Sequence, residues 1–223
     1  DHLGYKINRE SKFLSLKGKQ KLIAKDIFIG SDISSAAFFI VACLIVDGSC
    51  IEMCNVNINK FRTGIVTVLR GMGADIEITD IKEESNEFIG NIKVRHSKLK
   101  CADIKGEIIP SLIDELPILF IACASASGTS KISGIEELRY KESDRIMAME
   151  NGLRAIGINV NSSKDSIEIT GGKITGGKVD SYDDHRIAMS FAIAGLISQN
   201  SLTIMDTQNI STSFPTFVTI LRE

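Results

Sequence analysis

The stretch Glu137-Leu138-Arg139-Tyr140-Lys141-Glu142-Ser143-Asp144-Arg145-Ile146 packs three cations and three carboxylates into ten residues. The apolar side chains that follow recur at helical spacing: Ile146, Met149, Leu153 and Ile156. This period predicts a helix from Ser143 to Ile156. Ser143 is its expected N-cap, because a serine hydroxyl accepts hydrogen bonds from the backbone N–H groups of the first turn.

This helix start is unusual in its charge. Lys141 lies just outside the expected N-terminus and Arg145 lies in the first turn, where the partial positive charge of a helix favours anions. One interpretation is that Glu142 and Asp144 neutralise the cations locally. The other is a binding site for a phosphate or carboxylate ligand. The stretch alone leaves both open.

Working outward, the helix belongs to an internal repeat. The strongest match sets Leu69–Ile76 against Leu153–Val160, each the end of an amphipathic helix, a glycine and the start of a strand. Three aspartates, Asp32, Asp114 and Asp184, each precede an apolar helix. Those helices are expected at 34–46, 116–126 and 187–197. Amphipathic helices are expected at 62–72, 143–156 and 214–221. Extended runs at 13–16 and 21–23, broken at Gly18, predict a hairpin-like β region. Further strands are expected at 49–56, 74–79, 91–96, 129–135, 158–161, 166–170 and 202–206.

The repeat predicts the fold class. In each copy the first helix is apolar all round and therefore buried, while the second is amphipathic and lies outside. Repeats of this length, each with two helices and several strands, predict one α/β (α+β) domain of threefold pseudo-symmetry. Buried helices wrapped by sheets make it an inside-out α/β barrel. If the buried helices run parallel, their N-termini converge on one rim.

Residues distant in sequence then meet at that rim. Asp184-His185-Arg186 repeats the theme of an arginine in a first helical turn, which favours a polyanionic ligand. Each residue also has a simpler interpretation. Arg186 can pair with a neighbouring aspartate, Asp114 can serve only as an N-cap, and Glu142 can be a salt-bridge partner for Arg145 instead of exchanging protons with a ligand. His185 can be a satisfied helix-start histidine or a donor that orients the ligand.

The composition excludes several classes of protein. A net charge of −2 gives no overall attraction for nucleic acid or an acidic membrane. The longest apolar runs, at 36–46 and 187–197, are too short to span a bilayer. Glycines and lysines between 172 and 178 lack the spacing of a phosphate-binding loop and predict turns. His2, His96 and His185 lie far apart in sequence, so no zinc site is expected.

The cysteines bear on the compartment. Five of them, mostly within apolar runs and without a Cys-x-x-Cys pair, predict free core thiols and a reducing compartment: Cys43, Cys50, Cys54, Cys101 and Cys123. We therefore expect a cytoplasmic protein.

With these residues in hand, the chain resembles the C-terminal half of the 5-enolpyruvylshikimate-3-phosphate synthase family, in its class II branch. The motifs that carry the resemblance are Leu138–Arg145, Asp184–Phe191, Ile113–Ile118, Gly30–Ala36 and Ser213–Pro215. The resemblance implies a two-lobed fold of βαβαββ units. It also implies transfer of the enolpyruvyl group of phosphoenolpyruvate to the 5-hydroxyl of shikimate 3-phosphate, with release of phosphate and without a metal or organic cofactor.

The resemblance also implies roles. Asp114 is expected to be the base for the 5-hydroxyl, and Glu142 to handle the proton at the methylene carbon of phosphoenolpyruvate. Lys141 is expected to contact shikimate 3-phosphate. Arg145 and Arg186 are expected to bind the phosphoenolpyruvate anion, with Asp184 and His185 supporting the rim.

The sequence departs from the family in two ways. Thr212-Ser213 stands where many relatives have a lysine before the Phe-Pro pair, which leaves glyphosate sensitivity undecided. The N-terminal lobe is almost wholly absent. Residues 1–29 are expected to be a remnant of that lobe, a β segment and hinge, and residues 30–223 the C-terminal lobe with its third repeat incomplete. Because the chain starts at Asp1 without methionine, we interpret its start as a cut end.

A chain with half of the cleft is expected to be inactive alone, and to need the missing N-terminal lobe. We expect the protein to be a monomer that binds neither nucleic acid nor membranes. Two alternatives remain: a UDP-N-acetylglucosamine enolpyruvyl transferase, which shares the fold and the enolpyruvyl donor, and a non-catalytic anion-binding domain of the same fold. The Lys141–Arg145 and Asp184–Met189 runs favour the shikimate enzyme.

Overall fold

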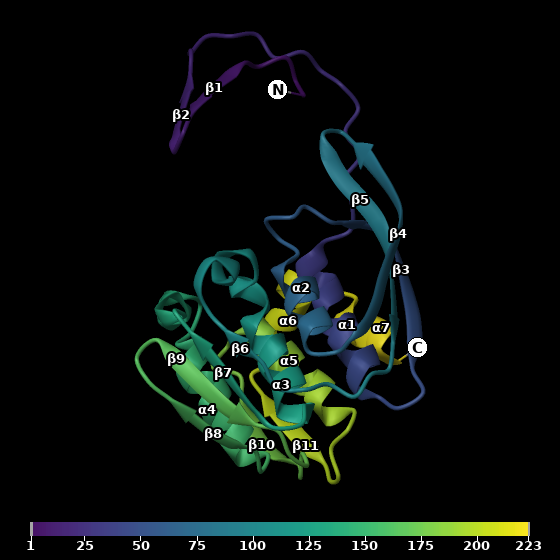
Figure 1. The fold of residues 1–223 in the computed structure, drawn as a ribbon, viewed down its shortest axis with the longest axis vertical. Coiled ribbons are helices and arrows are strands. Elements are labelled where there is room, and N and C mark those ends of the chain that lie inside the picture. Colours follow the sequence, from purple (N-terminus) through teal and green to yellow (C-terminus); the bar gives the residue numbers. More distant parts are fainter. Residues whose placement is uncertain (1, 223) are drawn as a thin grey trace.

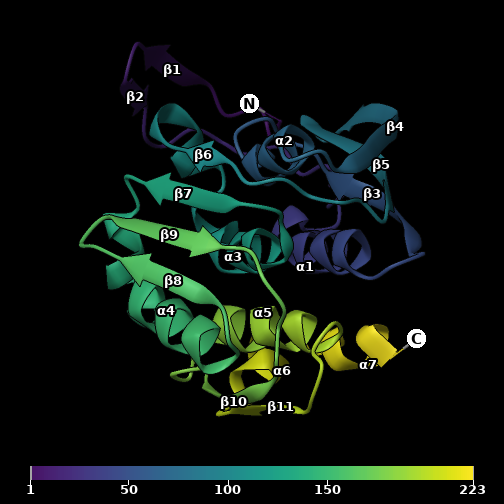
Figure 2. The ribbon, with the colours of Figure 1, turned by 60° about the horizontal axis from the view of Figure 1, so that its bottom comes forward.

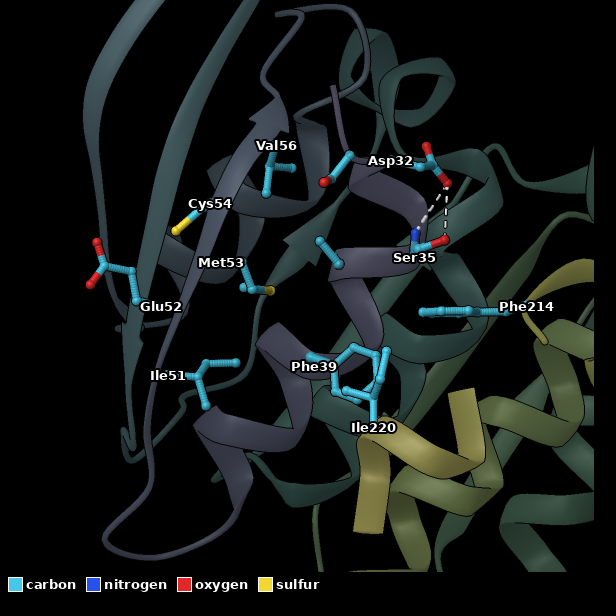
Figure 3. A pocket seen from close by; sticks show the side chains of 12 residues that line it. Asp32, Ser35, Phe39, Ile51, Glu52, Met53, Cys54, Val56, Phe214 and Ile220 are labelled. Carbon is cyan, nitrogen blue, oxygen red and sulfur yellow. Dashed lines mark hydrogen bonds between the residues drawn. The ribbon is translucent and has the colours of Figure 1, made fainter. Parts of the chain in front are cut away.

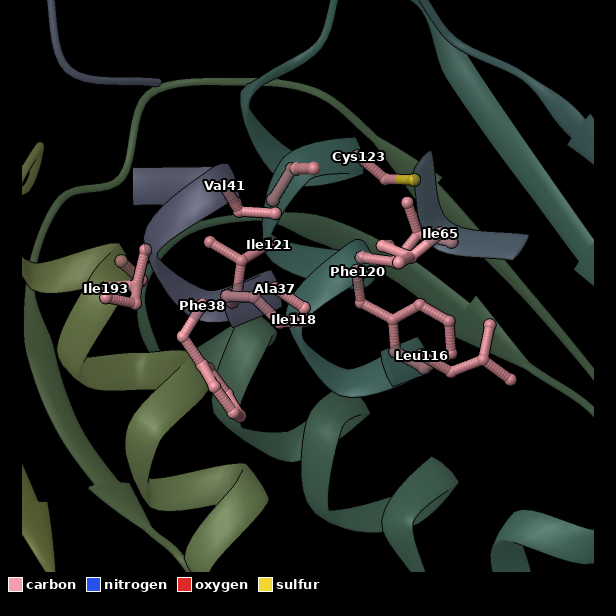
Figure 4. Packing of buried hydrophobic residues seen from close by; sticks show 14 of the residues in the cluster. Ala37, Phe38, Val41, Ile65, Leu116, Ile118, Phe120, Ile121, Cys123 and Ile193 are labelled. Carbon is pink, nitrogen blue, oxygen red and sulfur yellow. The ribbon is translucent and has the colours of Figure 1, made fainter. Parts of the chain in front are cut away.

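The computed structural model describes residues 2–222, and three helices form its centre. They are α1 (Ile33–Ile45), α3 (Leu116–Ser125) and α5 (His185–Gly195), and each contacts the other two. Figure 2 shows them side by side inside a shell of strands and outer helices. Figure 4 shows how their apolar side chains interlock, with Phe38 of α1, Ile121 of α3 and Ile193 of α5 all buried. The prediction of buried first helices is confirmed.

Three sheets lie around these helices. The first has the order β3-β5-β4, the second β6-β7-β9-β8, and the third pairs β10 with β11. Their bounds are β3 (Cys50–Asn57), β4 (Asp75–Glu84), β5 (Glu87–Arg95), β6 (Asp103–Ile104), β7 (Thr129–Ser133), β8 (Asn159–Ser162), β9 (Ser166–Thr170), β10 (Gly177–Asp180) and β11 (Leu202–Met205). The mixed α/β class is confirmed, whereas closure of the sheets into a barrel stays a prediction.

The first two repeats share one topology. After the core helix comes a strand, then an outer helix, α2 (Gly64–Gly71) or α4 (Arg145–Ala155), and then an antiparallel hairpin. The second strand of the hairpin, β5 or β9, pairs antiparallel with the strand after the core helix. In the third repeat β11 is followed by two short helices, α6 (Asn209–Ser213) and α7 (Phe217–Arg222). The single helix predicted over 214–221 is therefore wrong in its bounds.

Several local predictions are also wrong. Helix α4 begins at Arg145, and its N-cap is Asp144, whose carboxylate accepts from the Met147 backbone N–H at 3.0 Å. Ser143 is thus not the cap. Asp114 does not cap a core helix either, because it lies in the 3-10 turn η2 (Ile113–Glu115) that precedes α3. Part of the stretch predicted as turns forms β10, a strand too rich in glycine and lysine for its local pattern to reveal.

The N-terminal segment stands away from this body, as Figure 1 shows. Strands β1 (Ile7–Glu10) and β2 (Phe13–Leu16) pair as an antiparallel hairpin, with every residue of both exposed. The predicted pairing of 13–16 with 21–23 around Gly18 is wrong, because β2 pairs with β1 instead and residues 21–23 form no strand. The chain turns at Ser11, where φ is 54°. The sequence of β1 has no apolar alternation, so only its pairing with β2 defines it. The lobe boundary near residue 30 stays a prediction.

Two further expectations can be compared with the structure. The five cysteines are free, but only Cys43 and Cys123 are buried, so the expectation of core thiols is wrong for Cys50, Cys54 and Cys101. Within residues 2–222, no helix has the length and apolar character needed to cross a membrane. The cytoplasmic location stays a prediction.

Candidate functional site

The N-termini of the three core helices meet, and the centre of the meeting point is a buried ion pair. The side chain of Arg145 is 1% exposed and that of Asp184 is 0% exposed. Arg145 donates Nε to Asp184 Oδ2 at 2.8 Å, and Ser143 donates its hydroxyl to the same oxygen at 3.1 Å. The other oxygen accepts the Arg186 backbone N–H at 2.9 Å, so Asp184 also caps α5. The pair joins the start of α4 to the start of α5.

The protonation of Asp184 follows from these bonds. Burial alone raises the pKa of Asp184, but hydrogen bonds and charge from Arg145, together with the Arg186 N–H, outweigh burial and lower the pKa overall. The carboxyl is therefore ionised at neutral pH. An ionised Asp184 holds the guanidinium of Arg145 at a fixed place on the rim.

The remaining nitrogens of Arg145 face two further carboxylates. Nη2 donates to Glu142 Oε2 at 2.5 Å. Nη1 lies 3.6 Å from Asp114 Oδ1, too far for a hydrogen bond. It is buried and, within the described part of the chain, has no hydrogen-bond partner. Buried N–H groups are rarely left unsatisfied, so this donor is available to an anionic ligand at the rim.

Lys141 completes one side of the cluster. Its ammonium lies 2.7 Å from Glu137 Oε1 and 3.4 Å from Asp114 Oδ1. The hydrogen bond that Lys141 donates to Glu137 is the main reason that the pKa of Lys141 is raised, so this side chain is a cation at neutral pH. Asp114 and Glu142 are half-exposed, at 44% and 53% of their side chains, and can both reach a molecule in solution.

Arg186 closes the other side. Its Nη1 donates to the backbone carbonyl of Asp114 at 2.9 Å and lies 3.8 Å from Glu115 Oε1. Glu115 is almost fully buried and accepts a hydrogen bond from the Ser34 hydroxyl at the start of α1. Burial is the main reason that the pKa of Glu115 is raised. One carboxylate thus joins the starts of all three core helices.

His185 lies beside this cluster. It lines a cleft of about 70 Å³ with Asp32, Ser34, Arg186 and Ser213. Burial is the main reason that its pKa is lowered, so the ring is neutral at pH 7. A neutral imidazole has one N–H donor and one acceptor, which suits it to orienting a ligand but adds no charge.

A more spacious pocket than the cleft at His185 lies elsewhere. It has a volume of about 600 Å³ and lies between α1, β3 and the C-terminal helices (Figure 3). Phe39, Met53 and Ile220 are among its mostly apolar lining residues, and Asp32 stands at its edge. Its apolar walls do not match an anion. The polar cluster around Arg145 is therefore the stronger candidate site.

The structure brings the sequence-predicted residues together. Asp114, Lys141, Glu142, Arg145, Asp184 and Arg186 form one connected cluster, and His185 borders it. Within residues 2–222, no three His, Cys, Asp or Glu side chains are grouped so as to hold a metal ion. The cluster can bind an anion through Lys141, Arg145 and Arg186, and its two half-exposed carboxylates can exchange protons with the bound molecule.

Sequence reasoning missed three members of the rim. Glu115 could have been found, because a carboxylate directly before an apolar helix with a proline near its start stands at an N-cap position. Ser34 and Arg62 had no comparable signal. Arg62 donates to Asp32 at 2.7 Å and to the Ser34 hydroxyl at 3.1 Å, contacts that only the packing of α1 reveals.

Comparison with known proteins identifies the family. The protein-family model described as EPSP synthase (3-phosphoshikimate 1-carboxyvinyltransferase) matches residues 1–221 of this chain. The chain belongs to the EPSP synthase family. A relative named 3-phosphoshikimate 1-carboxyvinyltransferase from Coxiella burnetii (strain CbuK_Q154) is 46% identical over 222 residues, covering 100% of this chain and 51% of the relative. A relative of the same name from Geobacter sp. (strain M21) is 46% identical over 209 residues, covering 93% of this chain and 49% of the relative.

Solved structures agree with this membership of the EPSP synthase family. EPSP synthase from Acinetobacter baumannii superposes with a TM-score of 0.95 at 40% identity, covering 99% of this chain and 52% of that chain. The enolpyruvyl transferase NikO from Streptomyces tendae shares the fold, with a TM-score of 0.75 at 15% identity over 99% of this chain and 50% of that one. The chain spans about half the length of the curated relatives it matches.

Proposed function

We propose that this chain is the C-terminal lobe of an enzyme that transfers the enolpyruvyl group of phosphoenolpyruvate to the 5-hydroxyl of shikimate 3-phosphate. The single observation that carries the proposal is the buried Nη1 of Arg145, which has no hydrogen-bond partner among residues 2–222. That donor lies beside two half-exposed carboxylates, Asp114 and Glu142. Both substrates are anions, and the reaction moves protons at two separate atoms, so it needs this combination of groups.

Each residue has a role in the proposal. Asp114 takes the proton of the 5-hydroxyl while the oxygen of that hydroxyl attacks C2 of phosphoenolpyruvate. Glu142 delivers a proton to the methylene carbon, which gives a tetrahedral intermediate, and removes a proton from the resulting methyl group as phosphate leaves. Lys141 binds shikimate 3-phosphate. Arg145 and Arg186 bind the phosphoenolpyruvate anion.

Asp184 and His185 support the bound anions. Asp184 fixes the guanidinium of Arg145 through the 2.8 Å bond to its Nε, and the neutral ring of His185 is available to orient a ligand atom. The two arginines stand at the starts of α4 and α5, so the partial positive charge of both helices adds to theirs. Fixed cations and dipoles stabilise charge that develops in a transition state without reorganising.

The proposal requires a partner, the N-terminal lobe, which would supply the other half of the cleft. On this basis the 223-residue chain alone should show no turnover, and an N-terminal lobe supplied in trans should restore it. Turnover by the isolated chain would contradict the half-site interpretation. The assay measures release of inorganic phosphate from phosphoenolpyruvate in the presence of shikimate 3-phosphate.

The roles are tested in the full-length protein. Asp114→Ala, Glu142→Gln and Arg186→Ala should each lower kcat by about 100-fold or more, because each removes an acid–base group or an electrostatic contact to the transition state. Glu168→Gln is a matched control, since Glu168 pairs with Lys131 on the exposed face of the second sheet. Wild-type rates in all three variants would remove the assigned roles.

The same assay separates the alternatives. Replacing shikimate 3-phosphate with UDP-N-acetylglucosamine tests the related transferase activity, which the proposal expects to be absent. A non-catalytic anion-binding domain would bind both substrates in a calorimetric titration of the full-length protein but give no product.

A further inference from the structure

The third cation of the charged stretch, Arg139, has no place in the roles above. It lies within the 3-10 turn η3 (Glu136–Tyr140). A link, residues 141–144, follows this turn and forms neither helix nor strand. This link carries Lys141 and Glu142, two of the residues assigned to the reaction. Because no secondary structure fixes the link, side-chain contacts must hold it in place.

Arg139 makes such contacts with all three of its guanidinium nitrogens. Nε donates to the Lys164 carbonyl at 2.7 Å, and Nη2 donates to the Ser163 carbonyl at 2.5 Å. Both carbonyls belong to the turn between β8 and β9. Nη1 donates to Asp144 Oδ2 at 2.7 Å. The planar guanidinium thus joins the turn between β8 and β9 to the end of the link.

Asp144 connects this clamp to the site. One of its oxygens accepts from Arg139, and the other accepts the Met147 N–H and so caps α4. The next residue is Arg145, whose guanidinium forms the centre of the cluster. The position of the helix start therefore depends on a carboxylate that Arg139 fixes. All three acceptors of Arg139 lie outside the substrate-binding cluster, so its effect on a ligand is indirect.

We propose that Arg139 is a positioning residue, which fixes the link carrying Lys141 and Glu142 relative to Arg145 by clamping Asp144 to the turn between β8 and β9. The proposal rests on the proposed function, since it concerns the geometry of that site. A lysine cannot replace this arginine, because an ammonium on a flexible stem does not offer three donors in a fixed fork.

The test compares two arginines on the same structural unit. Arg154, near the end of α4, also donates two guanidinium nitrogens to a backbone carbonyl, that of Val160, and pairs with Glu150. It lies at the end of α4 away from the cluster. Arg154→Lys therefore controls for loss of an arginine-to-carbonyl clamp without disturbing the link.

In the full-length protein, Arg139→Lys should lower kcat/KM for shikimate 3-phosphate by about 100-fold, the size expected when catalytic groups are misplaced by about 1 Å. Arg154→Lys should leave kcat/KM near the wild-type value. Hydrogen exchange of the backbone amides of residues 141–147 should speed up in Arg139→Lys and not in Arg154→Lys. This second measurement does not depend on enzymatic activity.

Chemical rescue distinguishes positioning from a general loss of stability. Arg139→Ala should regain activity when guanidinium is added at low, non-denaturing concentration, and sodium chloride at the same ionic strength should have no such effect. The outcomes separate two failures. An inactive wild-type protein overturns the proposed function. An active wild type with unchanged kcat/KM and unchanged exchange in Arg139→Lys overturns the role of Arg139.

Discussion

Helices α2 and α4 occupy the same position in the first and second repeats, and they end alike. Arg70 near the end of α2 and Arg154 near the end of α4 each donate two guanidinium nitrogens to a carbonyl of the strand that follows. Gly73 and Gly157 come next, with φ of 97° and 86°. These values lie in the left-handed region, where glycine is the favoured residue after a helix.

The two helices begin differently. The alignment that sets Leu69 against Leu153 places Phe61 opposite Arg145. Phe61 is 64% exposed, whereas Arg145 is 1% exposed and bound to Asp184. At the N-cap of α4 Asp144 makes a side-chain bond, while the residue before α2 makes none. The comparison teaches that the shared ends maintain the fold and that the divergent start of α4 carries the candidate site.

The largest effect should come from the divergent start. Arg145→Ala leaves Asp184 buried without its cation, and breaking a buried ion pair in this way costs about 3–5 kcal/mol of the free energy of unfolding. Phe61→Ala, at the equivalent exposed position, should cost well under about 1 kcal/mol. Urea unfolding of both variants of the full-length protein measures the difference. Equal losses at the two positions would break the comparison.

The Arg145–Asp184 ion pair should also make the free energy of unfolding depend on pH. The pKa of Asp184 lies below its ordinary value of 3.8 in the folded protein, so the unfolded chain takes up this proton first as the pH falls. The stabilisation from Asp184 is therefore present above pH 3.8 and is lost below it. The difference in free energy of unfolding between wild type and Asp184→Asn should be large at pH 7 and shrink below pH 3.8.

The contribution of Glu115 to stability should change with pH in the opposite direction. Its pKa is raised above the ordinary value of 4.5, chiefly by burial, so holding it ionised in the folded protein has an increasing cost as the pH rises above that value. Glu115→Gln should therefore gain stability relative to wild type between pH 4.5 and neutrality. Parallel pH profiles for the Asp184 and Glu115 variants would show that the two buried carboxylates are not held as the hydrogen bonds indicate.

Much of this fold could be predicted from the sequence, because its repeats carry strong local signals. The core helices lie in long stretches of mostly apolar residues, and the match at Leu69 and Leu153 reveals the outer helices and their strands. Strand β1 and strand β10 were missed for a common reason. Their residues are polar or glycine-rich, and only pairing with β2 or β11 makes them strands.

The site could be predicted only in part. Charges at helix starts are visible in sequence, and parallel core helices bring Asp114, Arg145 and Arg186 to one rim. The sequence did not show which of two neighbouring residues caps a helix and which binds another side chain. Ser143 and Asp144 are both good caps by residue type, and only the structure assigns the cap to Asp144 and gives Ser143 to Asp184. Glu115 meets Ser34 through packing across 81 residues, which no local pattern encodes.

The smallest effects should come from the shared ends. An alanine at Gly73 would have to adopt a left-handed φ, which costs about 1–2 kcal/mol of the free energy of unfolding. Its Cβ would meet nothing closer than the Lys98 carbonyl oxygen at 3.8 Å. At Gly157 the added Cβ would lie 2.7 Å from Thr175 Oγ1. Gly157→Ala should therefore lower the midpoint of urea unfolding more than Gly73→Ala does.

Neither glycine variant should change the affinity of the full-length protein for inorganic phosphate, measured by calorimetry. The reason is that Gly157 lies at the end of α4 opposite Arg145, and its clash with Thr175 can be relieved without moving the helix start. A loss of phosphate affinity in Gly157→Ala but not in Gly73→Ala would mean that strain at the end of α4 reaches its beginning. The two ends of the helix would then act as one unit, and the shared end could not be assigned to the fold alone.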